Sequence, residues 1–464
     1  MLNKTTSRRE FLKNSGQVAL GLSLIPNSLL QVANPPSSNR REGLVKDPVI
    51  RSGLVSAIHQ NLIPAASQRF YPGHFRISAD GRAYGNDTTW PGLDSWQMAG
   101  AYLLIGRTQL VLDYFRFVRA SQRKDGNIPF AIFNGDTRPG GFLSGLNYPD
   151  DVYQYAPLER EGVPDSALAI RKWIGLFVHW QPLAEPLGTL GATCYLLTAS
   201  EIFEATRDKE WLRDNISSVD RAARYLLTKI HTDGLVYGTG FYTELPPRRG
   251  CDGISQCYLV HAYRKLSELY RALGSRDEAH FWSHAADHLT DAFIKAFWRT
   301  DHFGEYLHFE RGLVDSHGLS DTNFAAIAFG LADHWHREKL WPKLVQAREF
   351  WLGNVPTQTV TKPFTYEDWE DTEPVNLPIE HGNDAAAMGR AYYLEALACI
   401  KMHDKARLLE CTRLVCKAAE NGYWRERYHP QKDGTVKPAG AAKYCEYPAV
   451  LTRIVLGNES LFSK

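Results

Sequence analysis

Apolar residues recur along this chain at three- and four-residue steps, the spacing of helices that bury one face. The clearest example ends at Gly274, and its apolar positions are Ile254, Tyr258, Ala262, Leu266, Leu269, Tyr270 and Leu273. Glycine is common directly after a helix because it adopts the left-handed conformation at little cost. Alternating apolar and polar positions, the pattern of strands, are scarce. The sequence therefore predicts an all-α protein.

The same periodicity predicts twelve helices joined by segments of alternating length. The helices are expected near residues 50–65, 94–105, 109–123, 187–205, 210–231, 253–273, 276–299, 321–333, 337–353, 384–401, 405–421 and 446–456. Short joints are expected around 106–108, 206–209, 274–275, 334–336 and 402–404. Long joints are expected around 66–93, 124–186, 232–252, 300–320, 354–383 and 422–445.

A short joint makes two neighbouring helices antiparallel, so this alternation indicates six helical hairpins. We expect the hairpins to close into an (α/α)6 barrel, a toroid with all its long joints at one end. The longest joint is expected to contain a short helix near 166–178. An open array of helical repeats is less favoured because no fixed repeat is visible in the sequence.

The first residues resemble an export signal. Arg8 and Arg9 precede a short apolar run over 18–25. Paired arginines before such a run are typical of the twin-arginine route, and the run is too short to span a bilayer. The expected partner is the twin-arginine translocase, and the expected location is the periplasm or the cell exterior, without a membrane anchor. The predicted division is a signal peptide over 1–33, a linker over 34–47 and the barrel over 48–464.

The composition of the chain bears on which partners and cofactors to expect. The chain has 53 basic and 52 acidic residues and a net charge of +1, which gives no electrostatic reason to expect nucleic acid as a partner. The seven cysteines match no zinc-binding spacing, so we interpret them as small buried apolar residues. No Gly-rich dinucleotide loop, phosphate loop or His-x-x-x-His metal pair is identified, so we expect no organic cofactor and no metal. Aromatic residues make up 12% of the chain, which suits both sugar stacking and a large helical core.

The long joints collect Gly, Pro, Trp, Tyr and acidic residues, and several of their segments resemble known enzymes. The resemblance is to the six-hairpin glycosidases of glycoside hydrolase families 63 and 37, the processing α-glucosidases and trehalases. The similar segments are Leu93-Asp94-Ser95-Trp96, the run 122–129 that ends in Ile-Pro, and Gln181-Pro182. The resemblance implies an (α/α)6 barrel that hydrolyses glycosidic bonds.

Three further segments carry the catalytic residues that the resemblance implies. The run 250–255 is similar to the acid segment Gly-x-Asp-x-Ser, with one extra residue before the serine, which makes Asp252 the expected general acid. The run 426–434 is similar to the base segment Glu-x-Tyr…Gly, which makes Glu426 the expected base. The segment Tyr366-Glu367-Asp368-Trp369 resembles instead the Trp-Glu-x-Trp base segment of α-L-rhamnosidases, so Glu367 is the rival base.

Glycoside hydrolysis generally uses one protonated and one ionised carboxyl group, which lie roughly 6.5–9.5 Å apart in inverting enzymes. Each candidate also has a structural interpretation. Asp252 and Asp94 each precede or open a helix and could be N-caps, although Asp94 is also a candidate ligand for sugar hydroxyls. Glu426 lies between two arginines and could form a surface salt bridge. The other residues expected to contact the sugar are Trp90, Trp96, Gln181, Glu244, Arg248, Trp369 and His381.

Two other classes of protein remain open. Sugar epimerases and polysaccharide lyases share helical toroids and transfer protons with His or Tyr, so a site centred on His179, His317 and His381 without an acid pair would favour them. A non-catalytic glycan-binding protein would have aromatic walls without two carboxylates across its cavity. The sequence favours an exported, inverting glycoside hydrolase that acts on an oligo- or polysaccharide.

Overall fold

The structure is a computed structural model of the 464-residue chain. It describes residues 43–66, 75–82, 89, 91–92, 94–129, 131–133, 154–157, 177–180, 189–237, 248, 250–371, 386–419 and 424–463. The predicted signal peptide and most of the predicted linker lie outside these ranges and stay predictions.

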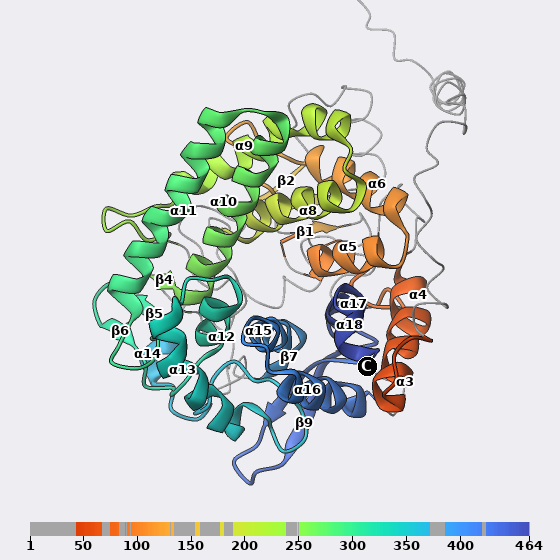
Figure 1. The fold of residues 1–464 in the computed structure, drawn as a ribbon, viewed down its shortest axis with the longest axis vertical. Helices are drawn as coiled ribbons and strands as arrows, with labels where there is room; N and C mark the ends of the chain where they lie inside the picture. The colour runs from red at the N-terminus through yellow and green to blue at the C-terminus, as the bar shows by residue number, and fades with distance from the viewer. Residues whose placement is uncertain are drawn as a thin grey trace, which may run out of the picture.

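Six helices form a closed inner ring (Figure 1). They are α5 (Asp94–Leu104), α8 (Leu190–Thr206), α10 (Gly253–Leu273), α12 (Asp321–Ala328), α15 (Gly389–Lys401) and α17 (Glu446–Gly457). Each packs against the next in this order, and α17 packs against α5. The chain therefore runs once around a central axis, and its last inner helix closes the ring beside the first.

An outer layer of helices covers this ring. Its members are α3 (Pro48–Ser56) with its continuation η1 (Ala57–Leu62) and α4 (Ile63–Ala65), then α6 (Thr108–Arg119), α9 (Lys209–Leu227), α11 (Arg276–Phe297), α13 (His334–Gln346) and α16 (Lys405–Ala418). The helices α6, α9, α11, α13 and α16 each pack on the inner helix that directly precedes them, while α3 and η1 pack on α17. The six-hairpin (α/α)6 barrel expected from the sequence is confirmed.

The two layers differ in how the sequence buries them. The inner helix α8 buries every residue from 190 to 200, as a helix with protein on all sides must. The outer helix α9 buries one face, and Asp208 caps it by accepting hydrogen bonds from the amides of Glu210 and Trp211. The helix α10 ends at Gly274, which takes the left-handed conformation expected from the sequence (φ 80°).

The connections alternate as predicted, with short ones at 105–107, 207–208, 274–275, 329–333 and 402–404. The long connections contain short helices and three small antiparallel sheets that the sequence analysis did not anticipate. Their strands are β1 (Ala131–Phe133), β2 (Gln154–Pro157) and β3 (Phe177–Trp180) in the order β1-β3-β2, then β4 (Cys251–Asp252), β5 (Tyr306–His308) and β6 (Gly312–Val314), and β7 (Ala387–Met388), β8 (Arg425–Pro430) and β9 (Val436–Ala442). The short helices are η3 (Arg348–Phe350), α14 (Asp368–Asp371) and α18 (Glu459–Phe462). The helix expected near 166–178 lies outside the described residues, except that 177 and 178 belong to β3.

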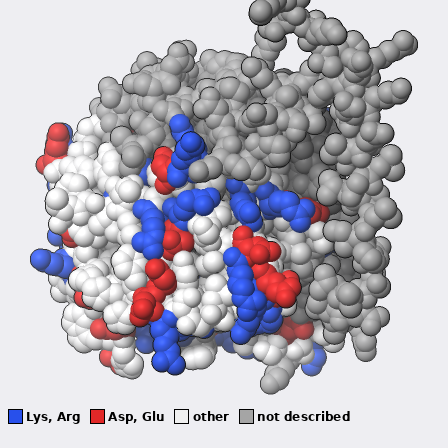
Figure 2. Space-filling model, turned by 90° about the horizontal axis from the view of Figure 1, so that it is seen from above, with Lys and Arg blue, Asp and Glu red and all other residues white. Residues whose placement is uncertain are grey.

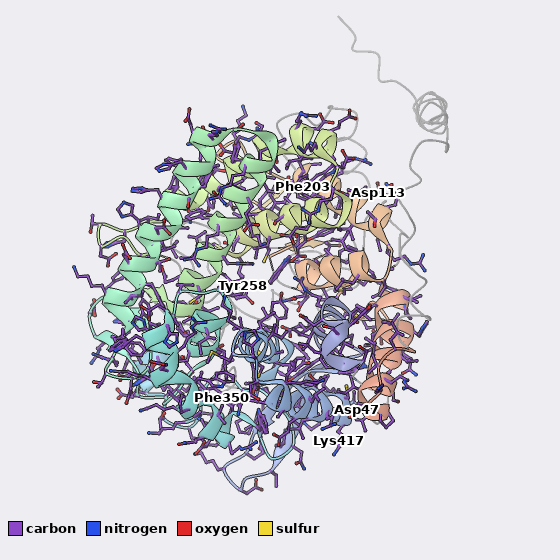
Figure 3. The ribbon with its side chains drawn as sticks, viewed as in Figure 1. Asp47, Asp113, Phe203, Tyr258, Phe350 and Lys417 are labelled. Atoms are coloured by element: carbon purple, nitrogen blue, oxygen red, sulfur yellow. The ribbon has the colours of Figure 1, made fainter. Side chains whose placement is uncertain are left out.

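Aromatic side chains fill the middle of the ring. Tyr258 extends from α10 toward the centre in Figure 3, and its ring meets that of Trp96 edge-on, with centroids 5.7 Å apart. All seven cysteines are buried, as expected for small apolar side chains. On the face shown in Figure 2, the basic and acidic side chains of the described residues are interspersed. Among the described residues, no helix combines the length and the apolar character needed to cross a membrane.

Candidate active site

The inner helices begin at the end of the barrel that carries the long connections. The helices α10 and α12 start in contact, because a Cβ atom on Gly253 would lie 2.5 Å from Cγ2 of Thr322. The helices α15 and α17 also start in contact, because the amide of Arg390 donates to Oε1 of Glu446 at 2.9 Å. Helix N-termini stabilise negative charge, so this end of the ring suits carboxylates. The candidate site residues gather here in two groups.

The first group, which we call the Arg248 network, contains Arg248, Asp252, Glu305, Asp321, His317 and Glu370. The guanidinium of Arg248 is buried and donates to three carboxylates: to Glu305 at 2.7 Å, to Asp321 at 2.8 Å and to Asp252 at 3.1 Å. A buried cation of this kind is stable only when paired. The sequence analysis expected Arg248 to contact a sugar, whereas in the structure it holds the starts of α10 and α12 together.

Asp252 is fully buried and caps α10. Its Oδ2 accepts hydrogen bonds from the amide and the hydroxyl of Ser255 at 2.7 and 2.8 Å. The capping interpretation is therefore confirmed, and capping coexists with the ion pair to Arg248. Gly250 allows this placement: it has a φ of 107°, and a Cβ atom on it would lie 2.2 Å from the carbonyl oxygen of Leu307 in the neighbouring strand β5.

His317 lies on the far side of Glu305. Its Nδ1 is 2.5 Å from Oε2 of Glu305, and its Nε2 is 3.2 Å from Oε2 of Glu370. Burial alone would lower the pKa of His317, but the two carboxylates outweigh it and raise the pKa to about 9. Burial would likewise raise the pKa of Glu305, but Arg248 and His317 bring it down to about 2. His317 is thus a buried imidazolium between two carboxylates.

Asp321 is a carboxyl group of this network whose pKa is raised. Burial raises its pKa to about 7. The positive charge of Arg248 lowers this pKa, and the negative charges of Asp252 and Glu305 raise it further. Its Oδ1 accepts from Arg248, while its Oδ2 is buried and accepts no hydrogen bond from the described residues. Asp321 therefore exchanges its proton near neutral pH.

The second group, the Arg390 cluster, contains Asp94, Arg390, Glu426 and Glu446. Asp94 is the first residue of α5 and accepts a hydrogen bond from the hydroxyl of Tyr444 at 2.5 Å. Glu446 is the first residue of α17, and its Oε1 accepts from both the amide and Nε of Arg390 at 2.9 Å. The negative charge of Glu426 raises the pKa of both carboxyl groups, and the positive charge of Arg390 lowers both. The three carboxyl groups therefore lie near one another and near the guanidinium of Arg390.

Two carboxyl groups of the Arg390 cluster have raised pKa values. Burial raises the pKa of Glu446 to about 7. Arg390 lowers this pKa, whereas the charges of Asp94 and Glu426 raise it. Burial also raises the pKa of Asp94 to about 6, although Arg390 and the hydroxyl of Tyr444 lower it. Like the Arg248 network, this cluster has more carboxyl groups than cations; Glu446 titrates near neutral pH and Asp94 somewhat below it.

The hairpin of β8 and β9 holds Glu426. Its Oε2 accepts from the amide of Ala441 at 2.9 Å, and its Oε1 lies 3.4 Å from the guanidinium of Arg427. The pairing of the two strands shifts between residues 425 and 427, and such bulges re-aim side chains beside active sites. Gly440 has a φ of 68°, and a Cβ atom on it would lie 2.3 Å from Oε2 of Glu426, so this position needs glycine for two reasons.

The two groups lie on opposite sides of the ring. Asp252 caps α10, whereas Glu426 lies in the cluster at the start of α17, and these helices stand opposite each other in the order α5, α8, α10, α12, α15, α17. Asp94, at the start of the neighbouring α5, belongs to the side of Glu426. The structure therefore brings Asp252 and Arg248 together, and it brings Asp94 and Glu426 together.

The rival base Glu367 is exposed, and its Oε2 accepts from the indole of Trp369 at 2.6 Å. The neighbouring Glu370 is the residue of this segment that enters the Arg248 network, where it also accepts from the hydroxyl of Tyr306. Trp96 is enclosed in the core, where its indole donates to Oε1 of Glu201 at 3.0 Å. The remaining predicted contacts, Trp90, Gln181, Glu244 and His381, and the side chain of His179, lie outside the described part of the chain.

Sequence reasoning missed the residues Glu305, Asp321, Glu370, Arg390 and Glu446. Asp321 and Glu446 open predicted inner helices, as Asp94 does, so a search for acidic residues at every inner-helix start would have found both. Arg390 and Glu305 carry no such signal, because their roles depend on which inner helices are neighbours in the ring.

Comparison with known proteins shows which proteins this chain is similar to. Residues 190–357 match the model of the bacterial α-L-rhamnosidase six-hairpin glycosidase domain. The matched stretch is 168 of the 464 residues, and over it the chain is similar to six-hairpin glycosidases. The likeness to six-hairpin glycosidases and to rhamnosidases, expected from the sequence, is confirmed. A comparison with curated proteins finds no match by sequence.

Solved structures share the fold of this six-hairpin domain at low sequence identity. A family 63 mannosylglycerate hydrolase from Thermus thermophilus in complex with glucose superposes with a TM-score of 0.58 at 14% identity, over 87% of this chain and 99% of that one. A family 78 rhamnosidase from a Bacillus species gives 0.56 at 14% identity over 89% of this chain, which spans only 35% of the rhamnosidase. A rhamnosidase from Klebsiella oxytoca with rhamnose bound gives 0.54 at 11% identity, over 88% of this chain and 64% of that one.

Proposed function

We propose that this protein is an exported glycoside hydrolase that cleaves a glycosidic bond of an oligo- or polysaccharide with inversion. One observation carries the proposal: carboxyl groups converge at one end of the ring from two opposite sides, at the starts of α10 and α12 and at the starts of α5 and α17. An inverting hydrolase needs carboxyl groups on both faces of the sugar, one to protonate the leaving oxygen and one to activate water.

In this proposal Glu426 is the general base. A base must be ionised and fixed in place. The amide of Ala441 and the guanidinium of Arg427 make the contacts that a carboxylate accepts, and the close approach of Gly440 limits its movement. Asp94, beside Glu426, is placed to accept hydrogen bonds from hydroxyl groups of the sugar.

The proposed general acid is Asp252, supplied with a proton by its network. Asp252 and Asp321 accept from the two terminal nitrogens of one guanidinium, so the two carboxyl groups are close neighbours. The contacts of Asp252 are those of a carboxylate, whereas Asp321 has a pKa of about 7 and keeps a proton. We propose that this proton is shared within the pair and reaches the leaving oxygen from Asp252.

The alternative of an epimerase or a lyase that uses a histidine finds less support. His317 is held as a cation by Glu305 and Glu370, so its ring has no lone pair free to accept a proton from a sugar. The excess of carboxyl groups on both sides likewise favours hydrolysis over binding without catalysis.

The test is product release from a panel of α- and β-linked glycosides, with the product anomer followed by NMR. Inversion is the expected outcome, and loss of activity is expected in Asp252→Asn and in Glu426→Gln. Glu278→Gln serves as a matched control because Glu278 lies on the outer helix α11 and is half exposed. Activity that survives in Glu426→Gln and disappears in Glu367→Gln would transfer the base role to Glu367. Retention of the anomer would refute the proposed mechanism.

The export part of the proposal rests on Arg8 and Arg9. Replacing both by lysine should keep the protein in the cytoplasm, as judged by fractionation of cells that express it. Unchanged export of the double variant would indicate another route.

A further inference from the structure

The outer helix α11 carries three histidines at four-residue spacing, His280, His284 and His288. This spacing repeats the pattern His-x-x-x-His, which places two imidazoles on one helix face and is a frequent arrangement for binding a metal ion. The chain has 16 histidines in 464 residues, so three within nine residues are a concentration. The expectation that the protein binds no metal did not take this spacing into account.

The rings of His284 and His288 are the closer pair. Their centroids are 4.2 Å apart and their planes meet at 84°, whereas the centroids of His280 and His284 are 6.2 Å apart. An imidazole bound at about 2.0–2.1 Å has its ring centroid roughly 3.2 Å from the zinc ion, so two imidazoles of one tetrahedral site have centroids roughly 5 Å apart. The centroids of His284 and His288 are closer than this, so the two side chains must rotate apart to bind one ion together.

Both rings are exposed and available. Neither makes a hydrogen bond to another of the described residues, in contrast to His317 and His336, which are held by carboxylates. A histidine that serves only the fold is usually satisfied by a partner, as those two are. His284 and His288 have their ring nitrogens free to bind an ion from solvent.

A hollow beside the pair supplies further ligand atoms. It has a volume of about 600 Å³ and is lined by both histidines, by Asp291 from the next turn of α11 and by Asp233 from the connection after α9. No group of three or more His, Cys, Asp or Glu side chains in the described ranges is already assembled around one point. The histidines would therefore make the first two bonds, and water or one of these exposed carboxylates would complete the coordination.

We propose that His284 and His288 form a binding site for a divalent transition metal of the zinc or copper class. Imidazole nitrogens select these ions over magnesium and calcium, which prefer oxygen ligands. The ion would bridge one turn of α11 and so bind the folded form only. The site lies on the outer layer, separate from the carboxylate groups at the starts of the inner helices, and does not depend on the proposed hydrolase activity.

The test uses the purified full chain and zinc chloride, with magnesium chloride and a chelator as references. Calorimetric titration should give a saturable zinc isotherm, and zinc but not magnesium should raise the melting temperature, because a ligand of the native state stabilises it. Copper(II) should bind more tightly than zinc. Loss of groups that merely support a metal ligand costs 10–100-fold in affinity, so His284→Ala and His288→Ala should each weaken zinc binding at least about tenfold.

His334→Ala is the matched control, since His334 is an exposed histidine on the outer helix α13 that pairs with Glu338 rather than with a second histidine. It should bind zinc as the unmodified protein does. The proposal is overturned if the unmodified protein shows no zinc isotherm, or if His284→Ala and His288→Ala bind zinc unchanged. It is also overturned if His280→Ala removes binding and His288→Ala does not, because the other pair would then hold the ion. Circular dichroism of each variant checks that α11 remains folded.

Discussion

Replacing Asp321 by asparagine tests whether the Arg248 network holds a proton. Asparagine keeps an acceptor for Arg248 and resembles the protonated acid in shape. The pKa of Asp321 is raised from 3.8 to about 7 in the folded protein, so the folded state binds this proton more tightly than the unfolded state. The stability that the proton contributes is fully present below pH 3.8 and is lost as the pH rises through 7.

The size of the effect follows from the shift. One pKa unit corresponds to about 1.4 kcal/mol, so between pH 5 and pH 8 the unmodified protein should lose about 3 kcal/mol of its free energy of unfolding through Asp321. The Asp321→Asn variant lacks this loss. It should match the unmodified protein at pH 5 and exceed its stability by about 3 kcal/mol at pH 8.

Urea unfolding at pH 5, 6, 7 and 8 measures this difference. The contributions of Asp94 and Glu446 are common to both proteins and largely cancel. Asp287→Asn, at an exposed position of α11, is the control for replacing a carboxyl group outside the network. A difference in free energy between Asp321→Asn and the unmodified protein that stays constant from pH 5 to pH 8 would refute the proton assignment.

Three further changes test the site and its support. Asp252→Asn and Glu426→Gln should each lower kcat by about 10²–10⁴; because Asn caps helices about as well as Asp, a fully active Asp252→Asn would leave Asp252 as a cap only. Gly440→Ala should lower both the melting temperature and the activity, since the new Cβ collides with Glu426. Gly434 in the same hairpin also has a positive φ (81°) but has open space around it, so Gly434→Ala should spare the activity. Equal activity of the two variants would contradict this. Trp96→Phe leaves Glu201 without its indole donor and should cost about 1–3 kcal/mol in urea unfolding, while Trp335→Phe at an exposed site should cost little; equal losses would argue against that hydrogen bond.

The sequence alone could predict the barrel because local signals determine it. Helical periodicity, the glycine after α10 and the alternation of short and long joints each act within a few residues. Most described helices lie near their predicted ranges, but α12 ends at Ala328 and α13 at Gln346, well before the predicted ends at 333 and 353. The three small sheets were missed because their strands are two to seven residues long and pair across the long connections. A strand as short as β4, which holds Cys251 and Asp252, has too few positions to show an alternating pattern.

The candidate site was only partly predictable, for a different physical reason. Asp252 and Glu426 could be proposed from motifs, but their partners depend on neighbours in the closed ring. Arg390 contacts Glu446, which follows it by 56 residues, and Arg248 contacts Asp321, which follows it by 73 residues. Glu367 was preferred to Glu370 because it fits a segment pattern, whereas burial in the structure favours Glu370 as the member of the network.

The toroid itself explains why its site is rich in carboxyl groups with unequal proton affinities. Closing six hairpins brings the starts of six inner helices to one end, and each start favours a negative charge. The acidic residues at four of these starts, Asp94, Asp252, Asp321 and Glu446, are buried; Arg248 pairs with Asp252 and Asp321, and Arg390 pairs with Glu446. The carboxyl groups without sufficient compensation retain protons, as the raised pKa values of Asp94, Asp321 and Glu446 show, while Glu305 is fully ionised. Acid–base hydrolysis needs one carboxyl group that holds a proton beside another that does not, and the packing of this ring produces such a difference before any substrate is bound.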